Sequence, residues 1–200
     1  MRDNVLWLLE GASSDAVAGG TQWYPIARRW CKLQAKRYDV RPVVVAAIIS
    51  ALSPRNKWAT NLKDTIAVLE SYADGYRHPF NIIATAFKKN VEKAWKVVVE
   101  DDPSYVTTSP KTRAFVDNIA NPGSKLVTVD VWAMRICEGD LLMKPKTLNE
   151  QKYQAYADVY LDVAQEVELK PSVLQAITWV EARNRAGIDA RSAQQQLRLL

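Results

Sequence analysis

The 200-residue sequence contains few of the side chains that bind metals or act as nucleophiles. Its two cysteines, Cys31 and Cys137, lie far apart and form no Cys-x-x-Cys pair, and it has a single histidine, His78. Structural zinc sites need clustered cysteine and histidine ligands, so this scarcity argues against them. One histidine also leaves little material for a Ser-His-Asp triad. We therefore expect neither a metal nor any other cofactor.

Long apolar runs, low-complexity segments and an excess of glycine or proline are also absent. No run approaches the roughly 18–20 apolar residues of a membrane span. Asp3 and Glu10 interrupt the short apolar patch at the N-terminus, which therefore does not resemble a signal peptide. We expect a cytoplasmic protein with no membrane partner.

The overall composition is that of a folded chain with a basic surface. Hydrophobic residues make up 48% of the sequence and charged residues 24%, which suits one domain with a buried core, residues 1–200, and we expect a monomer. The formal net charge is +5 and the pI is about 9.2, consistent with a polyanionic partner. Seven tryptophans are many for this length, and base-stacking surfaces also use aromatic rings.

Apolar residues recur at helical spacing along most of the chain, and no pair of strands is evident, so the sequence predicts an all-α fold. One helix is expected to start near Lys111 and another at Asp130. Residues 13–20, with two serines and two glycines, are expected to be flexible, and residues 139–147 to form a loop. The other expected helices are 5–9, 22–38, 42–52, 58–70, 80–87, 90–99, 149–167, 171–185 and 189–200.

The most informative stretch runs from residue 109 to residue 135. Lys111 lies at the start of one helical segment and Asp130 at the start of the next, 19 residues later. The helix dipole and free backbone N–H groups stabilise an ionised carboxylate at a helix start. Such a fixed anion can stabilise an oxocarbenium-like sugar, and a nearby amine can hold phosphate or attack a sugar carbon. An ordinary helix N-cap and an ordinary surface lysine explain the same two residues, so both interpretations stay open.

This stretch resembles the helix-hairpin-helix (HhH-GPD) DNA glycosylase superfamily, whose familiar branch is the endonuclease III-like enzymes. Thr107 and Ser109 replace the family's hairpin glycines, the Lys-to-Asp spacing is one residue longer, and the iron–sulfur tail is absent. The chain thus resembles a divergent endonuclease III-like member without an iron–sulfur cluster, and compact members of that kind resemble phage or anti-phage proteins. The matching elements are Lys111-Thr112, Val129-Asp130 and Arg135, five residues beyond the aspartate.

A second similarity lies in the helix–loop–helix of residues 42–70. Endonuclease III-like enzymes have a buried helix ending in Leu-Leu-Ser-Ala, followed by a loop that enters the duplex. Here Ile48-Ile49-Ser50-Ala51 matches that ending, and Leu52 follows where the family often has glutamine. By this resemblance Leu52 would occupy a vacated base position. An ordinary polar loop is the alternative.

The resemblance implies a two-lobed helical glycosylase fold with a degenerate helix-hairpin-helix. Lobe A would contain about residues 1–40 plus 138–200, and lobe B about 41–137 with the hairpin; the flipped base would enter a cleft between them. Asp130 would stabilise the sugar cation, and Lys111 would attack C1′ in a lyase reaction or hold phosphate. The residues implied to bind DNA are Ser53, Arg55, Asn56, Lys57, Thr107, Thr108, Ser109, Thr112, Arg113 and Arg135. Those implied to form a base wedge or pocket are Leu52, Trp23, Tyr24, Trp58 and Trp132.

The implied function is that of a DNA glycosylase. It would flip a damaged or modified base out of double-stranded DNA and cleave its N-glycosidic bond, leaving an abasic site. Two alternatives stay open: a base-hypermodification enzyme of the same fold acting on a modified pyrimidine in phage DNA, and a non-catalytic helical DNA-binding protein. A helical scaffold with incidental charge is a further interpretation, and it predicts no salt-sensitive DNA binding.

Overall fold

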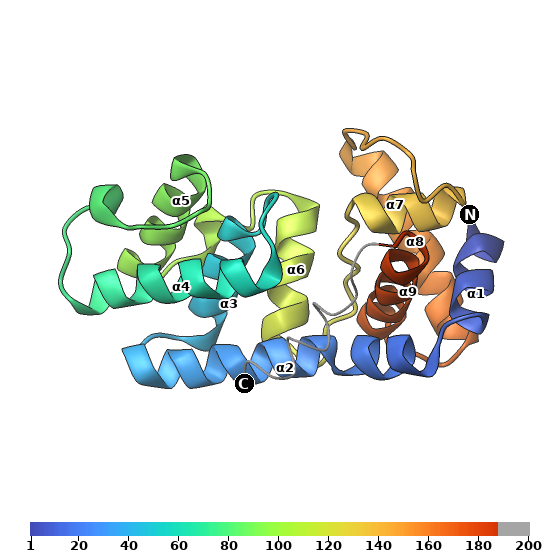
Figure 1. Cartoon of the computed structure of the whole chain (residues 1–200), viewed down its shortest axis with the longest axis horizontal. Helices are drawn as coiled ribbons and strands as arrows, with labels where there is room; N and C mark the ends of the chain where they lie inside the picture. The colour runs from blue at the N-terminus through green and yellow to red at the C-terminus, as the bar shows by residue number, and fades with distance from the viewer. Residues whose placement is uncertain (188–200) are drawn as a thin grey trace. The chain divides into compact units, whose positions relative to one another are not determined.

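Figure 1 shows the computed structural model of the chain, which describes residues 1–187. These residues form α-helices and two 3-10 turns and contain no β-strand, which confirms the predicted all-α class. The described residues divide into two compact units: a terminal unit of residues 1–26 and 121–187, and a middle unit of residues 27–120. Residues 121–137, expected in the middle lobe, thus belong to the terminal unit, since α7 packs into its core.

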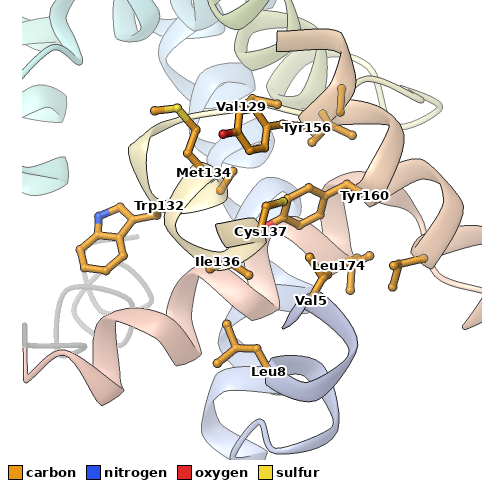
Figure 2. Close-up of a cluster of buried hydrophobic side chains, with 14 of the residues drawn as sticks. Val5, Leu8, Val129, Trp132, Met134, Ile136, Cys137, Tyr156, Tyr160 and Leu174 are labelled. Atoms are coloured by element: carbon orange, nitrogen blue, oxygen red, sulfur yellow. The ribbon is translucent and has the colours of Figure 1, made fainter. Parts of the chain in front are cut away.

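The terminal unit is a cluster of helices around one apolar core. Figure 2 shows Tyr160 beside Cys137 in this core, with Leu174, Ile136 and Val5 packed around them. The helices α1, α7, α8 and α9 all contact one another there. Its elements are α1 (Arg2–Glu10), residues 14–26 of α2 (Ser14–Tyr38), α7 (Val131–Glu138), α8 (Glu150–Glu166) and α9 (Pro171–Arg185).

The middle unit is built around α3 (Pro42–Leu52). Every residue of α3 from Val44 to Leu52 is buried, and the helix contacts α4, α5 and α6, as Figure 1 shows. The apolar run 43–52 is therefore a buried helix, as predicted from Pro42 in its first turn. The other elements are the remainder of α2, α4 (Trp58–Ala73), η1 (Pro79–Asn81), α5 (Lys88–Val99), η2 (Pro103–Tyr105) and α6 (Pro110–Ala120).

The predicted flexible stretch of residues 13–20 is wrong, because α2 begins at Ser14 and runs through it. Gly20 has a role in helix packing instead. A Cβ atom on Gly20 would lie 2.4 Å from Cα and 2.5 Å from the backbone nitrogen of Ile177 on α9. Gly20 therefore allows two helices of the terminal unit to pack with their backbones nearly in contact.

The predicted helix at residues 80–87 is also wrong. Only the 3-10 turn η1 forms there, and α5 begins at Lys88. The apolar residues that suggested a helical face do not pack into the core, since Phe80 is 81% and Ile83 93% exposed. The expected helix at 189–200 lies outside the described residues, whereas the one predicted at 171–185 matches α9.

We expect Gly20→Ala to lower the free energy of unfolding by about 1–3 kcal/mol, because the methyl group forces α2 and α9 apart. Helix propensity alone predicts a gain of roughly 1 kcal/mol, so the two explanations differ in sign. Urea unfolding followed by circular dichroism measures the difference. The control is Gly123→Ala, in an exposed turn where the nearest atom is Asn121 Oδ1 at 3.4 Å. A Gly20→Ala protein more stable than the wild type would contradict this packing.

Candidate functional site

Asp130 occupies the start of α7 in the terminal unit. It is the N-cap residue, and its Oδ1 accepts hydrogen bonds from the backbone N–H groups of Trp132 at 3.0 Å and Ala133 at 2.9 Å. The carboxylate is partly exposed, and it faces the positive end of the helix dipole. The predicted position of this carboxylate at a helix start is thus confirmed.

The segment before Asp130 is buried, and among the described residues it pairs with no strand. Residues 127–129 are all below 9% exposed. Val129 N donates to Val127 O at 3.1 Å across a three-residue turn. The hydroxyl of Tyr153 on α8 bridges the same two groups, since it donates to Val127 O at 2.7 Å and accepts from Val129 N at 3.1 Å. Burial and, to a lesser extent, the Asp130 charge raise the pKa of Tyr153 to about 12, so the hydroxyl keeps its proton. Tyr153 therefore fixes the backbone that delivers Asp130.

A second tyrosine holds the same segment from another helix. Tyr24 of α2 places its hydroxyl 3.3 Å from Thr128 Oγ1 and 3.2 Å from Gln175 Oε1 on α9. Its ring meets that of Trp23 edge to face at 4.7 Å. Tyr24, predicted for a base pocket, is 5% exposed and thus belongs to this buried polar network.

Two arginines and two tryptophans form a cluster between α7 and α9. Trp132 and Arg135 lie on α7, and Trp179 and Arg183 lie on α9. The Arg135 guanidinium lies over the Trp132 ring at 4.7 Å, and its Nε donates to Met143 O at 2.9 Å. The Arg183 guanidinium lies 6.0 Å from the Trp132 ring and 4.6 Å from the Trp179 ring. Figure 2 shows Trp132 pointing away from Cys137 and Tyr160. The guanidinium groups of Arg135 and Arg183 thus both contact the indole of Trp132, which lies two residues after Asp130.

Lys111 belongs to the middle unit, on the first turn of α6, and is exposed. The segment before it, predicted to be a hairpin, contains no residue with positive φ between 102 and 110, so its backbone does not use the conformation that glycine favours. Ser109 Oγ accepts from Thr112 N and Thr112 Oγ1 accepts from Ser109 N, both at 3.3 Å. This reciprocal cap occupies two of the hydroxyls predicted to bind DNA.

The loop of residues 53–57, also in the middle unit, is held by the buried carboxylate of Asp64. Asn56 Nδ2 donates to Asp64 Oδ2 at 3.0 Å, and Arg55 adopts the left-handed conformation with φ 58°. Arg55 and Lys57 are exposed. Leu52, predicted as the base wedge, is fully buried, because it ends α3 inside the core.

The remaining predicted residues are described here by unit. Trp58 is half-buried at the first position of α4, Ser53 Oγ donates to Ser50 O at 3.0 Å, and Thr108 and Arg113 are exposed. Thr107 is half-buried. The middle unit therefore contains most of the predicted DNA-binding residues, and the terminal unit contains Asp130, Trp132 and Arg135.

Charge is divided unequally between the units. Residues 27–120 carry sixteen lysines and arginines against nine aspartates and glutamates, whereas the rest of the sequence carries eleven against thirteen. The four helices that begin in the middle unit have no acidic residue in their first turn. A cation stands at each of these helix starts: Arg41, Lys57, Lys88 and Lys111.

This arrangement opposes the helix dipole, which favours anions at helix starts. In the terminal unit α1, α2, α7 and α8 follow the usual rule, with carboxylates at their starts. Cations added to helix N-termini raise the positive potential that attracts phosphate groups. Sequence reasoning noted the basic residues singly and missed this regular placement, which became visible once the helix starts were known.

Neither cysteine provides a nucleophile. Burial raises the pKa of the Cys31 thiol to about 12, and burial likewise raises that of Cys137 to about 12. No group of three or more His, Cys, Asp or Glu side chains within residues 1–187 is arranged to hold a metal ion. In the same part of the chain no helix has the length and apolar content required to cross a bilayer.

The chain belongs to a family of unknown function, DUF7178, whose model matches residues 1–186. No curated protein and no solved structure matches the chain.

We expect Tyr153→Phe to destabilise the protein by about 1–2 kcal/mol, because it removes two buried hydrogen bonds and leaves Val129 N and Val127 O only the bond that joins them. Hydrogen exchange at the Val129 amide should accelerate in this variant. The control is Tyr76→Phe, which removes a hydroxyl from a side chain that is 44% exposed, so its loss should stay below about 0.5 kcal/mol. Equal effects of the two variants would contradict the role given to Tyr153.

Proposed function

We propose that this DUF7178 member is a DNA glycosylase that flips a damaged or modified base out of DNA and cleaves its N-glycosidic bond. The observation that carries the proposal is Asp130, a capped and partly exposed carboxylate fixed behind a buried, hydrogen-bonded segment. A fixed anion of this kind costs no reorganisation when positive charge develops beside it. The sequence resemblance gives the same residue the catalytic role.

In this reaction the C1′–N bond breaks and its electron pair leaves with the base. The sugar then carries the positive charge of an oxocarbenium ion, which the Asp130 carboxylate stabilises. Water adds to C1′ and releases a proton, leaving an abasic site. In a lyase variant the Lys111 amine adds to C1′ instead and forms a Schiff base, which leads to strand cleavage.

The charge pattern of the middle unit supports DNA as the substrate. Its helix starts carry cations where carboxylates would stabilise the helices, and a bound phosphate backbone would reverse that electrostatic penalty. In the terminal unit, Arg135 of α7 and Arg183 of α9 both contact Trp132, two residues after Asp130. Arginine recognises phosphate groups through its planar donors.

A second candidate is DNA binding without chemistry. The observation that favours it is the N-cap itself, since the Asp130 carboxylate already has a structural use in starting α7. The cation pattern supports binding equally under both functions. Transfer chemistry on a modified pyrimidine, the third possibility, would require Asp130 in an active role as well.

We expect Asp130→Asn to reduce base release by at least about 100-fold while it keeps the fold and the DNA affinity, because asparagine caps a helix but carries no charge. The assay incubates duplexes containing uracil, oxidised, alkylated or phage-type modified pyrimidines with the protein, cleaves abasic sites with alkali and resolves the strands. Borohydride traps any Schiff base, and Lys111→Gln should abolish trapping. Asp162→Asn, an exposed carboxylate on α8, is the charge-matched control.

The outcomes separate the candidates. Base release by the wild type and by Asp162→Asn, but not by Asp130→Asn, supports a glycosylase and identifies its base. Unchanged release by Asp130→Asn would rule out its catalytic role. Binding to every duplex without release from any would leave the non-catalytic candidate and transfer chemistry on a modified pyrimidine.

We expect the DNA affinity to fall steeply with salt, and the slope of log K against log salt to shrink by about 0.9 for each phosphate contact removed. Lys57→Gln and Lys111→Gln each remove a cation from a helix start of the middle unit. Lys144→Gln, in an exposed loop of the terminal unit, is the matched control and should leave the slope unchanged. Fluorescence anisotropy over a salt series measures all three. Equal slopes for all variants would contradict a role for the helix starts.

A further inference from the structure

The connection between α4 and α5 exposes an unusual set of side chains. Two of the three phenylalanines of the chain lie there, Phe80 at 81% and Phe87 at 56% exposure, together with Ile83 at 93%. Tyr76 is 44% exposed, and His78, the single histidine, is exposed as well. Exposed large apolar side chains gathered in one segment mark a binding surface.

Rings dominate this surface. Four of the five side chains carry a ring, and only Ile83 is aliphatic. His78 and Phe80 already stack, with centroids 5.6 Å apart and planes tilted by 33°. Flat faces presented to solvent in this way match flat ligands, which can stack on them.

The segment is fixed at its far end. Asp64 on α4 is 4% exposed and accepts hydrogen bonds from Thr85 N at 3.0 Å, Thr85 Oγ1 at 2.8 Å and Ala86 N at 3.1 Å. A buried carboxylate requires such donors, so the loop is anchored directly before Phe87. The same carboxylate holds Asn56 of the 53–57 loop.

Within residues 75–91 the charged side chains are all cations. Residues 75–91 contain no aspartate or glutamate but include Arg77, Lys88 and Lys89, and all three cations are exposed. Lys88 and Lys89 form the first turn of α5, where the helix dipole adds to their positive potential. The ligand that fits is therefore both flat and anionic along its length.

We propose that residues 76–89 bind an unpaired nucleic acid strand. Phe80 and Phe87 stack on bases, while Arg77, Lys88 and Lys89 hold the phosphates. Rings interleaved with cations are the basis of sequence-tolerant single-strand binding. In a duplex the base faces are covered by their neighbours, so only an unpaired strand offers both partners. This site goes beyond the chemistry proposed at Asp130 and does not depend on it.

The test measures binding of a fluorescein-labelled oligothymidine by anisotropy. Phe80→Ala with Phe87→Ala should raise Kd by roughly 10- to 100-fold, the loss expected for stacked bases. Phe80→Tyr should bind like the wild type, because it keeps a ring. Ile83→Ala is the control, since it removes an equally exposed apolar side chain without a ring, and its Kd should change by less than about threefold.

Each other outcome overturns the proposal. No binding of oligothymidine by the wild type does so, as does equal loss in Ile83→Ala and the double alanine variant. Loss of binding to phosphatidylserine vesicles in the Phe80 variants, with oligothymidine binding intact, would identify a lipid surface instead. Asp130→Asn should bind oligothymidine like the wild type, so failure of the glycosylase assay and failure of this site are distinguishable.

Discussion

The arrangement of the terminal unit depends on one tyrosine hydroxyl that ties a buried stretch of irregular backbone to α8. Buried N–H and C=O groups need hydrogen-bond partners, because leaving them unpaired away from water costs free energy. Val129 N and Val127 O bond each other across a three-residue turn, and the hydroxyl adds a second partner to each. Here Tyr153 serves as both donor and acceptor for residues 127–129, and Tyr24 contacts the side chain between them. The backbone that leads to Asp130 is thereby set by side chains from two helices.

In the middle unit several local features lower stability. Cations at the starts of α3 to α6 work against the helix dipoles, and Arg55 holds a left-handed conformation that a residue with a Cβ atom disfavours. The burial of α3 offsets these local penalties, since its apolar residues lie almost wholly away from water. A stable apolar centre thus tolerates helix starts that carry cations.

Periodicity in the sequence predicted the helices that bury an apolar face, and Pro42 and Pro171 marked two starts correctly. It failed where apolar residues have another use. Gly20 looked like a flexible residue, yet it permits a close helix contact that depends on a partner 157 positions away. Phe80 suggested a helix, yet it faces solvent. A local sequence pattern cannot show whether an apolar residue is buried or exposed, nor whether a glycine makes the chain flexible or permits close packing.

The candidate site divides in the same way. The N-cap at Asp130 was predictable because capping depends on a few neighbouring residues. The role of Tyr153 was not predicted, since its bonds to residues 24 and 26 positions earlier are a tertiary feature. Arg183 joins Trp132 from another helix and was not predicted for the same reason.

The carboxylate of Asp64 has a consequence for the stability of the middle unit. It is the shared support of two loops, one carrying Arg55 and Lys57 and the other Phe80 and Phe87. A substitution that removed this carboxylate would leave the donors of both loops without their acceptor at the same time. Two surface segments more than twenty residues apart in sequence thus depend on one buried side chain of α4.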